Sequence, residues 1–258
     1  MPPPPRRSPT GSSGRGNNAG GGPVRRPRPD AERERPPRPN EPQLADDIRA
    51  RDLDRFVMAG LRSLGDGLAE AVARHLVAAG RALDEDPELA LTHARYARAL
   101  APRIASVREA VGVAAYHTGD FATALAELRA VRRMTGDPTY LPVMADCERG
   151  LGRPERALAL VRDPDARRLS AAERVELAIV ESGARRDRGE MSAAVVALQG
   201  PALRRREVTD WTVRLWYAYA AALEDAGRLD EAREWFASVS AIDDDGETDA
   251  DEQLDRLS

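Results

Sequence analysis

The chain has 258 residues and a formal net charge of −4, and all 39 of its basic residues are arginines. Without lysine it can form neither a Schiff base nor a lysine-containing phosphate loop, which excludes the enzymes that depend on them. Aromatic residues make up only 4% of the chain, and no stretch alternates β-branched residues, so we expect an all-α fold. The single cysteine, Cys147, excludes an intramolecular disulfide and is expected to be a small buried thiol.

Residues 1–42 form a Pro/Arg/Gly-rich arm that holds 12 of the 19 prolines. Because it has almost no large apolar residue, this arm cannot bury enough surface to offset its chain entropy, and we expect it to be disordered. Nine arginines against four acidic residues make residues 1–45 basic. A solvated spacer, contact with nucleic acid and docking to a protein all stay open for the arm, although it lacks interleaved aromatics for base stacking.

Residues 44–67 predict a capping helix followed by a turn. The apolar residues of this segment recur near one helical face, and they are Leu44, Ile48, Leu53, Phe56, Val57 and Leu61. We expect the helix to pack on the next segment as a cap. An amphipathic helix that docks on a partner is the alternative.

A short motif recurs along residues 68–242. It consists of a glycine or a proline-containing substitute, an alanine five residues later, and an apolar residue four further on. The marker alanines are spaced by 34, 33, 37 and 38 residues, and they are Ala90, Ala124, Ala157, Ala194 and Ala232. Self-similarity at this spacing predicts a solenoid of about five antiparallel helix pairs.

The pattern resembles the tetratricopeptide repeat (TPR) family. The second copy carries the matching residues Val111, Gly112, Gly119, Phe121, Ala124 and Leu128, and the fifth carries Tyr219, Ala220, Gly227, Leu229, Ala232 and Phe236. The third copy departs from the family with Pro154 in place of a large residue, and the fourth with Ser182 and Gly183 in place of an apolar and a small residue. The resemblance implies a right-handed superhelix whose first helices line a concave groove.

Small residues are expected where the two helices of a pair cross closely, because only they let the backbones approach. These positions are Ala78, Gly112, Ala145 and Ala220 on the first helices, facing Ala90, Ala124, Ala157 and Ala232 on the second. Four glycines follow the first helices and are expected in the left-handed conformation that ends a helix. They are Gly119, Gly152, Gly189 and Gly227.

The resemblance places a partner-binding groove on the first helices, and its candidate residues are His75, Glu109, Tyr116, His117, Asp146, Arg149, Arg186 and Tyr217. Tyrosine and arginine are residue types that often anchor interfaces. Packing between repeats remains the alternative for these side chains. A loop between the fourth and fifth copies adds a possible basic site at Arg204, Arg205 and Arg206, with a solvated loop as the alternative.

The sequence shows no catalytic or metal-binding motif, and we expect no enzyme activity, cofactor or metal site. We predict a non-catalytic scaffold that presents its groove to an unidentified peptide or protein. The alternative is a nucleic-acid-associated factor in which the arm contacts the phosphate backbone and the repeats recruit protein. We expect a cytoplasmic protein without a membrane contact, and its oligomeric state stays open.

Residues 243–258 form an acidic tail with eight acidic residues against one arginine. We expect it to be disordered and to serve as a solubilising end. Folding back onto the arm or onto basic loops is the alternative.

Overall fold

The computed structural model describes residues 40–204 and 208–257, and within these ranges it contains twelve α-helices and no strand. The prediction of an all-α chain is therefore confirmed for this part. The predicted disorder of the arm falls on residues 1–39, outside the described residues. Residues 40–42, which we assigned to the arm, belong instead to the packed part, because Glu41 contacts His75.

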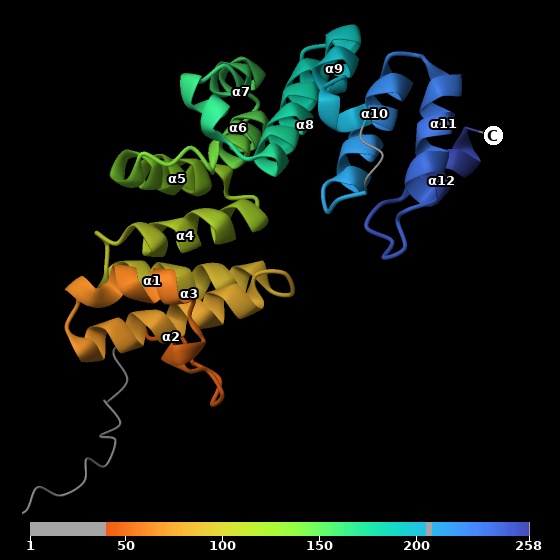
Figure 1. Cartoon of the computed structure of the whole chain (residues 1–258). Coiled ribbons are helices and arrows are strands. Elements are labelled where there is room, and N and C mark those ends of the chain that lie inside the picture. The colour runs from red at the N-terminus through yellow and green to blue at the C-terminus, as the bar shows by residue number, and fades with distance from the viewer. Residues whose placement is uncertain (1–39, 205–207, 258) are drawn as a thin grey trace, which may run out of the picture. The chain divides into compact units, whose positions relative to one another are not determined.

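Five pairs of neighbouring helices make up most of the structure (Figure 1). The pairs are α2 (Asp66–Ala82) with α3 (Pro87–Leu100), α4 (Ala105–His117) with α5 (Phe121–Thr135), α6 (Leu141–Gly150) with α7 (Pro154–Val161), α8 (Ala171–Asp187) with α9 (Met191–Leu198), and α10 (Thr212–Asp225) with α11 (Leu229–Ser240). From α2 to α11, every helix packs on the next one along the chain. Because short connections join helices that pack side by side, the chain reverses direction at each turn.

The turns inside four of these pairs depend on glycine. Gly119, Gly152, Gly189 and Gly227 have φ angles between 69° and 76°, which side chains with a Cβ rarely adopt. At Gly152, its own N–H donates to the carbonyl of Arg149, and the next N–H donates to the carbonyl of Glu148. Such bonds satisfy the free carbonyls at the end of a helix. The predicted left-handed glycines are thus confirmed.

The helices of the second pair cross closely at a glycine. A Cβ at Gly112 would lie 2.7 Å from Leu128 Cδ2, and Ala124 on the facing helix is fully buried. Ser182 takes the corresponding place in the fourth pair, twelve residues before Ala194, and it is also buried. Small residues therefore occupy the close crossings even where the sequence departs from the usual pattern.

Apolar clusters extend from one pair to the next. Val111, Leu128, Met144 and Cys147 belong to one cluster that joins α4, α5 and α6. Burial raises the pKa of the Cys147 thiol to about 12, so it packs as a small apolar group, as predicted. Each pair is stabilised by its neighbours, as expected for stacked repeats.

The predicted capping helix over residues 44–67 is broken into short pieces. It contains the short helix α1 (Arg55–Gly60), with the 3-10 turns η1 (Ala50–Asp52) and η2 (Leu61–Ser63) on either side, and its last two residues already belong to α2. The Asp54 side chain accepts hydrogen bonds from the N–H groups of Phe56 and Val57, which starts a new helix at this point. Ile48 and Leu61 are buried against α2 and its neighbours. Phe56 is 73% exposed, so it does not share the packed face.

The acidic tail is folded within the described residues, so the prediction of disorder there is wrong. Residues 250–256 form α12 (Ala250–Arg256), which packs against α11. Ala250, Leu254 and Leu257 contact the apolar cluster of the last helices, and this spacing places them on one helical face. The Asp243 carboxylate accepts hydrogen bonds from the N–H groups of Glu247 and Thr248, which closes the turn that leads to α12.

Candidate partner-binding face

Side chains near the ends of the first helices form hydrogen bonds from one pair to the next. The Tyr116 hydroxyl on α4 donates to the Asp146 carboxylate on α6 at 2.7 Å. Arg149, one turn further along α6, contacts Asp146 at 2.7 Å and reaches Asp187 on α8 at 2.8 Å. Three successive helix pairs are therefore linked through two carboxylates, a phenol and a guanidinium.

The same kind of contact continues to the C-terminal end. Arg186 on α8 pairs with Asp225 on α10, the Tyr217 hydroxyl on α10 donates to Asp249, and Glu224 pairs with Arg256 on α12. We call this set the polar ladder, and its members are Tyr116, Asp146, Arg149, Arg186, Asp187, Tyr217, Glu224, Asp225, Asp249 and Arg256. The ladder contains five of the eight residues predicted for the groove.

The electrostatics of the ladder follow from its pairing. Burial and the hydrogen bond to Asp146 raise the pKa of Tyr116, and burial and the bond to Asp249 raise the pKa of Tyr217 to about 12. Burial tends to lower the pKa of Arg149, but the nearby carboxylates of Asp187 and Asp146 outweigh this effect, so the pKa of Arg149 is raised. The phenols therefore remain neutral donors and the guanidinium remains charged.

The ion pairs of the ladder are only partly buried, and exposed ion pairs contribute about 0.2 to 1 kcal/mol each. The tyrosine and arginine side chains are also held by partners within the chain. Their first role is therefore to fix each pair against its neighbour.

A hollow of about 560 Å³ opens beside the middle of the ladder. It is lined by Phe121, Asp146, Arg149, Gly150, Gly152, Pro154, Glu155 and Asp187. Glycines create the space for the larger side chains: a Cβ at Gly150 would lie 2.4 Å from the Phe121 ring, and one at Gly183 would lie 2.7 Å from Arg149 Cζ. Three carboxylates surround a single guanidinium here, so the hollow is acidic and borders an aromatic ring.

The structure separates other predicted groove residues from this hollow. His75 is fully buried, with Nδ1 2.9 Å from His93 Nδ1 and Nε2 3.3 Å from the Glu41 carboxylate. It therefore has no exposed surface for a partner, contrary to the expectation. Glu109 accepts a hydrogen bond of 2.6 Å from the Tyr140 hydroxyl.

Two of the predicted residues are open to solvent. His117 is exposed at the end of α4, beside the Tyr116 ring. Arg204 is exposed at the end of η4 (Pro201–Arg204). Arg205 and Arg206, the other members of the predicted basic loop, lie outside the described residues.

The sequence did not lead us to Asp187 and Asp225, which are the acidic partners of Arg149 and Arg186 in the polar ladder. A signal for them existed, because Arg149 and Asp187 are 38 residues apart and Arg186 and Asp225 are 39 apart. Both separations are close to the spacing of the marker alanines. An arginine and an acid separated by one repeat occupy adjacent positions in a stack of pairs.

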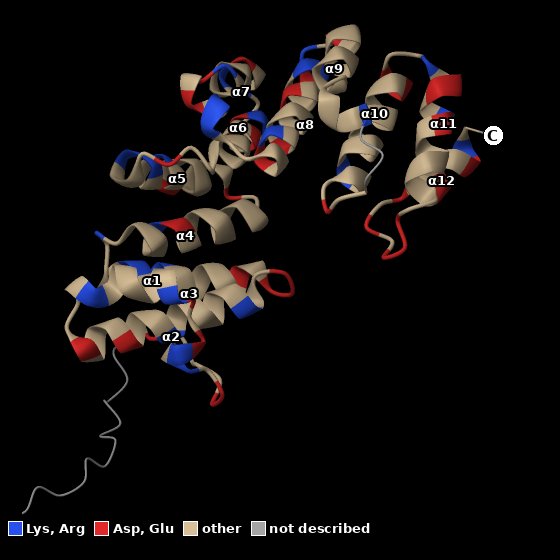
Figure 2. Cartoon of the chain, in the orientation of Figure 1, with Lys and Arg blue, Asp and Glu red and all other residues tan. Residues whose placement is uncertain are grey.

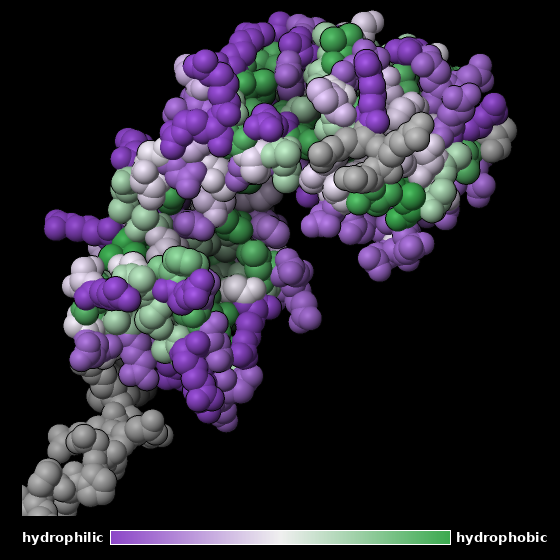
Figure 3. Space-filling model, viewed as in Figure 1, coloured by the Kyte–Doolittle hydropathy of each residue, from purple (hydrophilic) through white to green (hydrophobic). Residues whose placement is uncertain are grey.

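Basic and acidic residues are both scattered along the helices in Figure 2, and hydrophilic groups cover most of the face seen in Figure 3, with apolar groups between them. The residues that the structure describes include no group of three or more His, Cys, Asp and Glu side chains placed to hold a metal ion. No helix in the described ranges combines the length and apolarity of a membrane span. The sequence matches no family model, and it matches no curated protein.

Proposed function

We propose that this protein is a non-catalytic scaffold of TPR-like helix pairs, wound into a right-handed superhelix, that binds a peptide or protein partner on the face of its first helices. The repeated glycine turns and close small-residue crossings support the repeat architecture. A rigid stack of pairs holds surface groups at fixed positions along an extended face. Such a face suits recognition of a peptide or protein surface.

The observation that carries the proposal is the acidic hollow beside the polar ladder. It places the Phe121 ring and Pro154 next to the carboxylates of Asp146, Glu155 and Asp187. Binding sites commonly combine apolar surface with a few fixed polar groups. An arginine or lysine side chain of a partner fits this combination, since its alkyl part can lie on the ring while its charge meets the carboxylates.

Glu155 is the residue with which to test the hollow. Its side chain is 69% exposed, and its ion pair within the described residues is a long one of 3.8 Å to Arg188. Glu155→Arg reverses a charge in the hollow without removing a ladder contact. We expect it to weaken binding of a short fluorescent Arg/Phe-containing peptide by about tenfold in an anisotropy titration.

The matched control is Asp230→Arg. Asp230 also lies in the first turn of its helix and also pairs with an arginine at 3.8 Å, but it is on α11, outside the hollow. Both variants lose a favourable helix-dipole contact of similar size, so their melting temperatures should fall alike. Equal peptide binding by the two variants would contradict the assignment of the hollow.

A further inference from the structure

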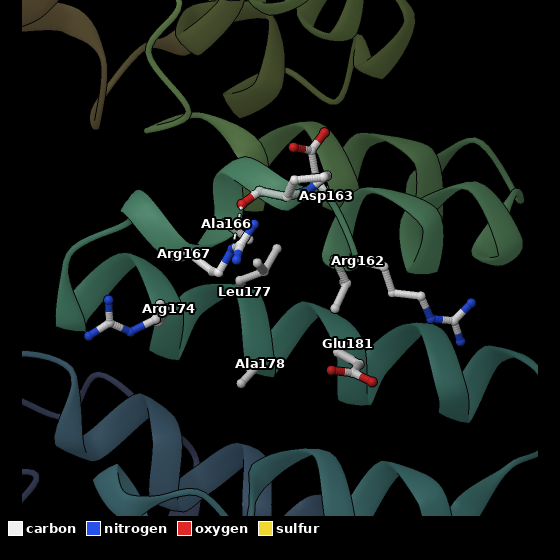
Figure 4. Close-up of a pocket in the computed structure, with 10 residues that line it drawn as sticks. Arg162, Asp163, Ala166, Arg167, Arg174, Leu177, Ala178 and Glu181 are labelled. Atoms are coloured by element: carbon white, nitrogen blue, oxygen red, sulfur yellow. Dashed lines mark hydrogen bonds between the residues drawn. The ribbon is translucent and has the colours of Figure 1, made fainter.

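A second hollow lies on another part of the chain and has the opposite charge. It has a volume of about 570 Å³ and opens between η3 (Pro164–Arg168) and α8 (Figure 4). Its floor is apolar, formed by Val161, Ala166, Leu177 and Ala178. Three exposed arginines surround this floor, and we call Arg162, Arg167 and Arg174 the arginine rim.

The acidic side chains in and around this hollow are already paired with arginines that do not line it. Asp163 and Asp165 both contact Arg132, at 2.8 Å and 2.9 Å, and Glu181 contacts Arg185 at 2.6 Å. The pKa of Asp163 lies below its ordinary value, mainly because Arg132 donates a hydrogen bond to its carboxylate. These acids therefore do not neutralise the rim.

The arginine rim itself lacks a carboxylate partner within the described residues. Arg167 and Arg174 donate to the backbone carbonyls of Pro164 and Leu169, which orient the side chains but carry no net charge. Many other arginines of the helix pairs are in ion pairs, as in the polar ladder. The rim is thus a local excess of positive charge over an apolar floor.

The directions of the three side chains indicate the kind of ligand. In Figure 4, Arg162 and Arg174 extend to opposite sides of the hollow, and Arg167 lies beside Leu177 between them. The charges are spread along the hollow, so one small anion cannot meet all three. An extended segment with several carboxylates can do so while its apolar side chains contact the floor.

We propose that the arginine rim and its apolar floor bind an acidic peptide segment of a partner protein, with Leu-like side chains between Asp or Glu residues. Charge complementarity selects this occupant over a basic or neutral one. Because single exposed ion pairs are weak, recognition depends on several carboxylates acting together with apolar contact. This surface shares no residue with the acidic hollow beside the polar ladder, so it is a second docking site.

The test is a fluorescence anisotropy titration of the full chain with a labelled peptide of repeated Glu–Leu–Glu units. We expect Arg162→Gln/Arg167→Gln/Arg174→Gln to weaken binding on the order of tenfold, from three lost ion pairs. The matched control is Arg103→Gln/Arg133→Gln/Arg156→Gln, three exposed arginines that do not line the hollow. The control should bind as the wild type does, and the wild-type affinity should fall as salt rises.

Other outcomes would overturn the proposal. If a Gln–Leu–Gln peptide binds equally well, charge does not select the ligand. If the rim variant binds the acidic peptide as tightly as the wild type, the site is elsewhere. A single-stranded RNA that binds the rim more tightly than the peptide would assign the surface to nucleic acid. Self-association that the rim variant abolishes would assign it to a second copy of the chain.

The Glu155→Arg variant should leave acidic-peptide binding unchanged, which separates this test from that of the acidic hollow.

Discussion

Gly112 on α4 lies directly against Leu128 on α5, so closely that a Cβ at Gly112 would be 2.7 Å from Leu128 Cδ2 and 2.8 Å from its Cγ. Leu128 is fully buried, and its neighbours leave it little freedom to move away. The spacing of the two helices in this pair therefore depends on the missing side chain. The contact also gives the sharpest test of the repeat register.

Gly112→Ala should destabilise the protein by about 1 to 3 kcal/mol, because the added methyl group overpacks the crossing. Gly80→Ala is the matched control, since Gly80 is exposed in α2 and a Cβ there meets nothing within 4 Å. Alanine is favoured over glycine inside a helix, so the control should gain about 0.5 to 1 kcal/mol. Denaturant unfolding measures both, and a shift in the same direction for the two variants would refute the assigned crossing.

The ion pair between Arg149 and Asp187 should couple the third and fourth helix pairs energetically. A double-mutant cycle with Arg149→Ala and Asp187→Ala is expected to give a coupling free energy of about 0.5 to 1 kcal/mol, because the pair still has solvent-exposed surface. The control is the exposed pair between Arg228, the residue before α11, and Glu231 in its first turn, and its coupling is expected to be smaller. A coupling of zero for Arg149 and Asp187 would show that the ladder does not hold the pairs together.

The buried pair His75 and His93 should make stability depend on pH. Burial lowers the pKa of both imidazoles, while Glu41 opposes this at His75 and the charge of Arg74 adds to it. The unfolded chain, with histidine pKa near 6.5, then binds more protons than the folded protein just below that pH. The free energy of unfolding therefore has its full value, as far as these two histidines are concerned, above about pH 6.5. It decreases as the pH falls below that value.

The measurement is the free energy of unfolding at several pH values between about 7 and 5. His93→Gln should flatten the decrease, because it removes one of the two buried imidazoles. His117→Gln is the control, since this side chain is exposed and is expected to leave the slope unchanged. An identical slope in the wild type and His93→Gln would rule out this origin of the pH dependence.

The folded tail should act as the C-terminal cap of the last helix pair. Ala250 is 2% exposed within the last apolar cluster, so Ala250→Asp places a carboxylate among apolar groups and should cost more than about 2 kcal/mol. Ala237→Asp is the control on the exposed side of α11, where only helix propensity is lost, about 0.7 kcal/mol. If thermal melts show the same decrease in melting temperature for the two variants, α12 does not cover the apolar core of the last helix pair.

The sequence alone determined the features that depend on near neighbours in the chain. Glycine is needed where a helix ends in a left-handed turn, as at Gly152, and small residues are needed twelve positions before each marker alanine, as at Gly112 and Ala124. These requirements come from local steric limits, so the same residue types recur at the same spacing in the amino-acid sequence. The all-α class and the pairing of neighbouring helices follow from them.

The tertiary structure decided which surface each polar side chain occupies. Arg149 and Asp187 meet only after two helix pairs have packed, and packing buries His75 against His93 instead of leaving it exposed as predicted. Ala250, Leu254 and Leu257 do not by themselves predict a stable helix. The helix α12 forms because these residues cover an apolar surface next to α11. The physical reason is the same in each case: contacts between residues 18 to 39 positions apart depend on how the pairs stack, and helical periodicity carries no information about that geometry.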